Sequence, residues 1–158
     1  MGLDAHVRCR CIQDGLAKPH PFPDRLALDD TIDPILTGDP PLDDLLAHDR
    51  WFCESCEHGG YIVSEPLGNM AVIAHVREVI GNIEQSHFLY VPLLKEKVIF
   101  NGVHSGDHIP SADALHLLEE VDTMLQFSGS LDDSDRKFFL SVKRLCKASI
   151  NTKNPIVF

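Results

Sequence analysis

Hydrophobic and polar residues alternate at the start of the chain, between residues 3 and 12. A period of two predicts a β-strand with one face turned towards the core. Cys9 and Cys11 both fall on the inward face of this expected strand, because successive side chains point to opposite faces. We therefore expect the two cysteines of this C-x-C pair to point the same way.

Apolar residues recur at helical spacing in one short segment and three longer ones. Asn69 and Ser111 stand at the starts of two of them, and both residue types are preferred as helix N-caps. Cys146 falls on the apolar face of the last segment, where we expect a core residue. The expected helices cover residues 42–51, 70–83, 112–126 and a stretch that opens at 132–134. In the first of them we expect one apolar face, made of Leu42, Leu45, Leu46 and Trp51.

The remaining segments predict strands and loops. Residues 13–41 combine six prolines with many aspartates, so we expect a long acidic loop, either mobile or engaged in binding. Strands and loops come first and helices later, which favours an α+β fold, a small sheet with an N-terminal strand and about three packing helices. The length of 158 residues indicates a single domain over 1–158. Expected strands lie at 26–28, 61–63, 88–94 (or simply an extended segment) and 155–158.

The formal net charge of −10 is concentrated in one part of the chain. Between residues 24 and 57, ten acidic side chains face only Arg25 and Arg50. Such a surface disfavours nucleic acid and favours a protein partner with a basic surface, although a merely solvated face is the alternative. The candidate partner-binding residues are Asp29, Asp30, Asp33, Asp39, Asp43 and Asp44.

Four of the five cysteines lie in two short clusters that also contain a histidine. The candidate metal ligands are Cys9, Cys11, Cys53, Cys56 and His58. Spacings of this kind suit a structural Zn²⁺ with four ligands, and either Cys53 or His58 supplies the fourth. Buried thiols without a metal, and redox chemistry, are the alternatives. Four protein ligands leave no position for an activated water, so a metal here is structural.

Signatures of catalysis are weak. Phosphate-binding, dinucleotide-binding and H-E-x-x-H motifs are absent from the sequence. His104, Ser105 and His108 gather in one turn-like segment, but Ser105 lies in no nucleophile elbow. His75 and His116 fall on expected helices, where a partly buried structural histidine is the default. We expect a protein that is not an enzyme.

Targeting signals are weak too. The longest apolar runs are too short for a membrane span, and the N-terminus has no secretory pattern. We therefore expect a cytoplasmic protein, where thiols stay reduced.

The start of the chain, M-G-L-D-A-H-V-R-C-R-C, resembles a family of small bacterial proteins of unassigned function. Cys56-Glu57-His58 and the later Ser64-Glu65 also match that family, and the resemblance covers roughly residues 1–126. Pro66 departs from the family, whose members have an aromatic residue after the S-E pair. The resemblance implies a ligand set of Cys9, Cys11, Cys56 and His58, with Cys53 as a local extra or a substitute ligand.

Single-domain acidic proteins of this kind resemble immunity proteins encoded beside bacterial polymorphic or secreted toxins. This second resemblance implies a non-enzymatic inhibitor whose partner is a cognate toxin with a basic surface. Two alternatives stay open: a small metal-dependent enzyme with an open metal position near His58, His104 or His108, and a zinc-free adaptor domain.

Overall fold

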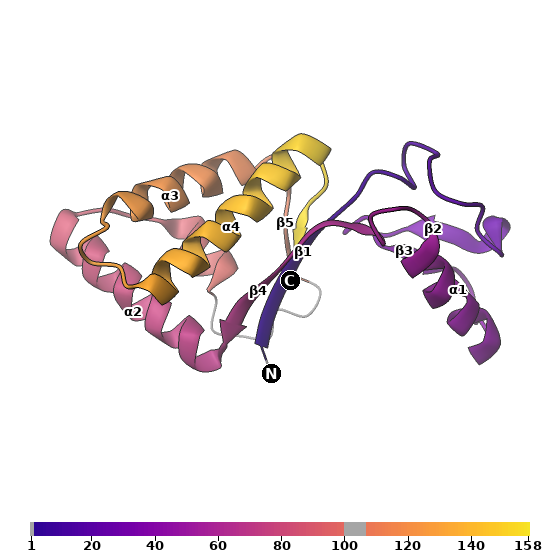
Figure 1. The fold of residues 1–158 in the computed structure, drawn as a ribbon, viewed down its shortest axis with the longest axis horizontal. Coiled ribbons are helices and arrows are strands. Elements are labelled where there is room, and N and C mark those ends of the chain that lie inside the picture. Colours follow the sequence, from indigo (N-terminus) through magenta and orange to yellow (C-terminus); the bar gives the residue numbers. More distant parts are fainter. Residues whose placement is uncertain (1, 100–106) are drawn as a thin grey trace.

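A computed structural model describes residues 2–99 and 107–158 of the chain (Figure 1). Helices and strands alternate irregularly, and the longest helix is α4. In chain order the elements are β1 (Gly2–Arg8), the 3₁₀ turn η1 (Pro23–Arg25), β2 (Leu26–Leu28), β3 (Pro34–Leu36), α1 (Leu42–Glu54), β4 (Tyr61–Asn69), α2 (Met70–His87), the π-helix η2 (Leu94–Val98), β5 (His108–Ile109), α3 (Ala114–Gln126), α4 (Asp133–Thr152) and β6 (Ile156–Val157).

The sheet is antiparallel, with strand order β4-β1-β6-β5, and β2 and β3 form a separate two-stranded pair. The long strands β1 and β4 pair along their whole lengths, from Gly2 opposite Asn69 to Arg8 opposite Tyr61. A mixed α+β fold with an N-terminal strand is therefore confirmed. Strands β2 and β6 lie where the sequence predicts them, and β3 was not predicted.

Two regions separate in Figure 1. We call the four-stranded sheet with α2, α3 and α4 the body, and residues 9–60, which contain β2, β3 and α1, the arm. Buried apolar residues of β1, β4 and the three body helices form one hydrophobic cluster, with Phe139 and Ile80 fully enclosed. Residues 9–60, all of which the structure describes, contribute nothing to this cluster. The arm is thus not stabilised by the hydrophobic core of the body.

The body helices follow the sequence pattern closely. Asn69 caps α2, since its side-chain oxygen accepts hydrogen bonds from the amides of Ala71 and Val72. Asp132 caps α4 through a reciprocal capping box with Asp135. Cys146 is fully buried in the core, as predicted.

One predicted strand is wrong: residues 88–94 form no strand, and η2 begins within them. Phe88 takes a left-handed conformation at the end of α2 and is almost fully exposed. The amide of Val91 donates to the carboxylate of Glu84, and the amides of Leu93 and Leu94 donate to that of Glu120. Side-chain carboxylates therefore accept the backbone hydrogen bonds that the carbonyls of a neighbouring strand would accept in a sheet.

Several smaller expectations also need correction. The N-cap of α3 is Asp113 rather than Ser111, and α1 continues to Glu54. His75 and His116 lie on helices as predicted, but both are exposed. His104 and Ser105, which belong to the predicted turn-like segment, fall outside the described residues. No helix in the described ranges combines the length and apolar character that a membrane crossing requires.

Candidate metal centre

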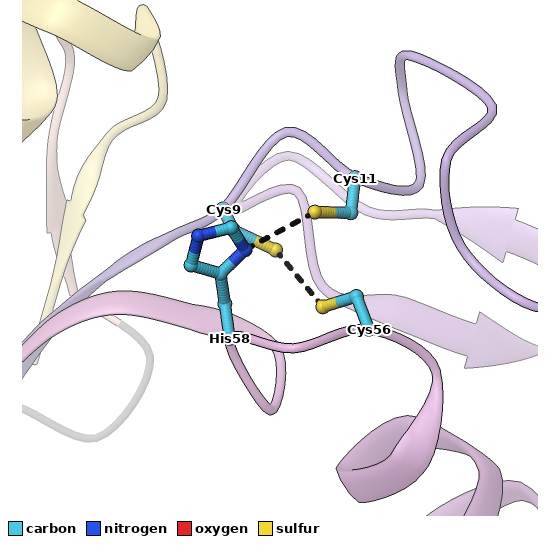
Figure 2. A group of neighbouring side chains, drawn as sticks. All are labelled: Cys9, Cys11, Cys56 and His58. Atoms are coloured by element: carbon cyan, nitrogen blue, oxygen red, sulfur yellow. Dashed lines mark hydrogen bonds between the residues drawn. The ribbon is translucent and has the colours of Figure 1, made fainter.

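Two turns bring four potential ligands together where the body meets the arm (Figure 2). We call this junction, made of residues 9–11 and 56–60, the neck. Cys9 and Cys11 follow the end of β1, and Cys56 and His58 lie between α1 and β4. Each turn thus supplies a pair with one residue between its members. The Sγ atoms of Cys9 and Cys56 are 3.7 Å apart, and Cys11 Sγ is 3.3 Å from His58 Nδ1. All four ligand atoms lie within 4.8 Å of one another, so the group can hold a metal ion.

The cysteines converge for a reason other than the one the alternation predicts. The expected strand over 3–12 is wrong in length, because β1 ends at Arg8. The amide of Cys9 still donates to the carbonyl of Gly60 at 3.1 Å, which joins the two turns. Beyond it, the carbonyl of Cys11 accepts hydrogen bonds from the amides of Leu16 and Ala17. A tight backbone loop, rather than strand geometry, directs the second cysteine.

Glycines shape the other turn. Gly59 and Gly60 both have positive φ, at 58° and 86°. A Cβ on Gly60 would lie 2.1 Å from the ring of Phe52, so this position accepts no side chain without displacing the ring. The pair of glycines lets the chain turn back from His58 into β4.

Cys53, the fifth candidate, is exposed on α1 and is not part of the group. The structure therefore places His58 beside the other three candidate ligands and leaves Cys53 outside. The sulfurs of Cys9 and Cys11 belong to buried residues, whereas the side chain of His58 is 34% exposed. His58 Nε2 lies 3.9 Å from the exposed carboxylate of Glu57, which is too far for a hydrogen bond.

The three thiols differ in acidity. Burial raises the pKa of Cys56, but the backbone amides of Gly60 and His58 and the thiols of Cys9 and Cys11 outweigh it and lower that pKa to about 6. Burial, followed by hydrogen bonds to the other two sulfurs, raises the pKa of Cys11 to about 12. A metal that binds all three sulfurs displaces the thiol protons, so binding weakens as pH falls.

Asn154, beyond the end of α4, supports the first cysteine turn from behind. Its side-chain amide is fully buried and donates to the carbonyl of Arg8 at 3.0 Å and to that of Cys9 at 3.3 Å. It also exchanges hydrogen bonds with the side chain of Gln13. Sequence reasoning missed this residue, because no local signal connects a C-terminal asparagine with a turn near the N-terminus.

Arg8 closes the neck on the other side. Its guanidinium lies over two aromatic rings that meet edge to face, 4.5 Å from the centroid of Phe52 and 4.3 Å from that of Tyr61. It also forms an ion pair with Asp33 in the arm. Stacking and pairing together hold this nearly buried charge. Arg8 therefore links the last residue of β1 to both α1 and the loop before β3.

A small polar cluster holds the arm together. His20, His48 and Trp51 are buried there, and the rings of His20 and Trp51 meet edge to face at 4.4 Å. The amide of Phe22 donates to His20 Nδ1, which leaves His20 Nε2–H to donate to His48 Nδ1 at 3.0 Å. His48 Nε2–H then donates to the carbonyl of Pro34. The chain of donors assigns a neutral tautomer to both rings, and burial lowers the pKa of His20.

The predicted partner-binding aspartates divide into two sets. Asp29 accepts hydrogen bonds from the amides of Thr31 and Asp33, and Asp33 and Asp44 form ion pairs with Arg8 and Arg25. These three carboxylates stabilise the arm itself. Asp30, Asp39 and Asp43 are exposed, with no side-chain hydrogen bond or ion pair among the described residues.

Comparison with protein-family models, with curated proteins and with solved structures gave no match. Three thiols and one imidazole, held from both sides of the neck, form a closed four-ligand set suited to fixing structure.

Proposed function

We propose that this protein is a non-enzymatic binding protein of the immunity type, which inhibits a bacterial toxin through its arm. The proposal depends chiefly on an exposed apolar stripe on α1. Leu42, Leu45 and Leu46 lie at helical spacing and are 69%, 40% and 53% exposed. Trp51, expected from the sequence to share their face, is buried instead against the arm.

Exposed apolar side chains grouped on one helix are typical of protein interfaces. The leucines are free for this role because α1 uses its other side, with His48, Trp51 and Ser55, to pack within the arm. The body, which has its own core, does not need them. An apolar stripe that serves neither region internally supports a contact with another molecule.

The charge around this stripe indicates what kind of molecule binds. Asp43 lies in the first turn of α1 next to the leucines, and Asp39 precedes it. With Asp30 they are the exposed members of the predicted partner-binding aspartates. Carboxylates around an apolar centre favour a partner with a basic rim and accelerate the encounter with it. The resemblance to immunity proteins makes a toxin with a basic surface the partner we propose.

We propose zinc as the metal at the neck. A tetrahedral ion with Zn–S distances of about 2.3 Å separates its sulfurs by about 3.8 Å, and Cys9 and Cys56 are 3.7 Å apart. Thiolate ligands select soft or borderline ions such as Zn²⁺ over Mg²⁺ or Ca²⁺. Four protein ligands close the coordination sphere, which supports a structural role and disfavours the metal-dependent enzyme.

The test uses the product of the neighbouring gene as the partner. Cells that express this product are grown with and without the present protein, and association of the two purified proteins is measured at several salt concentrations. We expect protection of the cells and an association rate that falls with added salt. Leu46→Ala is expected to weaken binding about tenfold or more, as for a central apolar contact. Asp43→Asn is expected to slow association.

Matched substitutions in the body serve as controls. Leu115 on α3 is also 53% exposed, and Asp133 lies in the first turn of α4 as Asp43 does in α1. Leu115→Ala and Asp133→Asn should leave binding unchanged. Absence of both protection and association would sink the proposed function. Equal losses in the arm and body variants would reject the arm as the binding surface.

A further inference from the structure

A second group of potential ligands lies in the body, where α4 begins beside α2 (Figure 1). His75 comes from α2, and Asp132 and Asp135 come from the N-terminus of α4. His75 Nε2 is 3.3 Å from Asp135 Oδ1 and 3.7 Å from Asp132 Oδ2. This group shares no residue with the centre at the neck and plays no part in the proposed function.

The capping box orients both carboxylates. Asp132 Oδ1 accepts from the amide of Asp135 at 2.8 Å, and Asp135 Oδ2 accepts from the amide of Asp132 at 3.0 Å. One oxygen of each residue is therefore bound to the backbone. The second oxygen of each faces His75, so the helix terminus holds two ligand atoms in place before any ion arrives.

Asp135 Oδ1 gives an independent indication that something binds here. Asp135 is only 2% exposed, and its Oδ1 is buried without a hydrogen-bond partner, although His75 Nε2 lies nearby. A buried carboxylate oxygen without a partner is costly, because the oxygen has given up water and gained nothing in return. A cation in contact with this oxygen removes that cost.

We propose that His75 Nε2, Asp132 Oδ2 and Asp135 Oδ1 bind a divalent cation. Ligands at about 2.1 Å from an ion lie about 3.0 Å apart in octahedral geometry and about 3.4 Å apart in tetrahedral geometry. The observed separations of 3.3 and 3.7 Å suit either arrangement. One imidazole with two carboxylates is a harder donor set than three thiolates, and it suits Mn²⁺ or Zn²⁺.

The site differs from the neck centre in being open. The side chains of His75 and Asp132 are 49% and 61% exposed, so water reaches the ion and completes its coordination. Two carboxylates neutralise a divalent charge, which offsets the unfavourable positive end of the helix dipole. Bound there, the ion joins α2 to the first turn of α4.

The experiment uses the full chain with its neck centre first saturated with one equivalent of Zn²⁺. Mn²⁺ is then added, because thiolate sites select Zn²⁺ over it, and binding is followed by the relaxation rate of water protons. We expect about one Mn²⁺ per chain and enhanced relaxation, since an open site keeps water on the ion.

Asp135→Asn is the decisive variant, since its side-chain oxygen can still accept the capping hydrogen bond while the second ligand oxygen is lost. Loss of a ligand should weaken Mn²⁺ binding by at least about tenfold, since changes behind a ligand already cost about 10–100-fold. His75→Gln, at an exposed position on α2, tests the same site if the first variant fails to fold. Asp133→Asn makes the same charge change in the same helical turn and should keep the affinity.

Each outcome of the Mn²⁺ titration either supports or overturns the proposed site. Binding that is lost in Asp135→Asn or His75→Gln and kept in Asp133→Asn supports the site. The absence of saturable Mn²⁺ binding overturns the proposal and leaves an ion pair between His75 and the two carboxylates. Equal weakening in all the variants also overturns it, because it indicates attraction by the overall negative charge.

Discussion

The body and the arm are held together by different forces, although the chain runs directly from β1 into the arm and from the arm back into β4. The body encloses an apolar core in which Phe139, Leu145 and Ile80 are almost wholly inaccessible to water. The arm encloses two neutral histidines and a tryptophan, has partly exposed ion pairs such as Arg25 with Asp44, and leaves leucines of α1 exposed. Burial of apolar surface is the main driving force for folding, and the arm has little of it.

This difference explains the position of the cysteine and histidine ligands. Segments of about 50 residues rarely fold without a disulfide, a metal or a partner, because they bury too little surface. A metal bound at the neck, as proposed, would fix both ends of the arm to the sheet, where Cys9 pairs with Gly60. Apolar residues of the arm can then remain outside, available to a partner, without loss of its fold.

The largest expected effect comes from removing the metal. Structural zinc binding contributes on the order of 10–16 kcal/mol in small peptides, which exceeds what the polar cluster of the arm can replace. Cys56→Ser, or treatment with a chelator, should abolish metal binding and expose amides of residues 9–60 to hydrogen exchange. Amides of α4 should keep their protection. Elemental analysis and hydrogen exchange by mass spectrometry measure both results, with one zinc per chain expected in protein purified without chelator.

Cys53→Ser is the matched control, because Cys53 is an exposed cysteine in the same segment and lies outside the group of ligands. It should leave the metal content and the exchange pattern unchanged. Parallel loss of protection in body and arm after metal removal would show that the two regions form one cooperative unit. The body and the arm would then not be stabilised separately.

Phe139→Ala is expected to have a smaller effect on stability, and one that arises within the body. Phe139 is fully buried and packs edge to face on Phe138 at 5.5 Å. Truncation of such a ring lowers the free energy of unfolding by about 3–5 kcal/mol. Leu140→Ala, at a neighbouring residue that is 45% exposed, should change it by less than about 0.5 kcal/mol. Urea denaturation measures both.

Metal content adds a second measurement to the Phe139→Ala experiment. The folded fraction of the variant should still carry one metal per chain, because the ligands lie at the neck and not in the core. A metal content that drops before the body unfolds would mean that core packing positions the ligands directly.

The two regions also differ in how far their sequences predict them. Helices α2 and α4 follow apolar periodicity and caps, as at Asn69, because each packs one stripe against the core. In the arm, apolar periodicity does not identify the buried face. The periodicity of α1 predicted that its leucines and Trp51 share a face, yet Trp51 packs on His20 and the leucines remain exposed.

The grouping of the candidate ligands was predicted more successfully than the elements that carry them. Spacing alone singles out the four cysteines of the two clusters, because thiols two or three positions apart can meet at one ion. The choice between Cys53 and His58 could not be made that way, since it depends on where α1 ends. Groups behind the ligands were beyond prediction, because they join segments far apart in the chain.

Asn154 provides the smallest and most specific test, because it joins the two regions without belonging to the core or to the ligand group. Its side chain reaches the Cys9 carbonyl from 145 positions away in the sequence. Asn154→Ala leaves the carbonyls of Arg8 and Cys9 without these donors, so the first cysteine turn loses its support. We expect metal affinity to fall about 10–100-fold, as for other groups that position a ligand.

Competition with a coloured chelator measures the change in metal affinity, and Asn151→Ala, at an exposed asparagine near the end of α4, is the control. A lower unfolding temperature with unchanged metal affinity would assign Asn154 to the body alone. A loss of affinity in Asn154→Ala that Asn151→Ala does not share would instead show that the body positions the metal ligands through a single side chain. The neck would then be the point where the core of one region sets the geometry of the other.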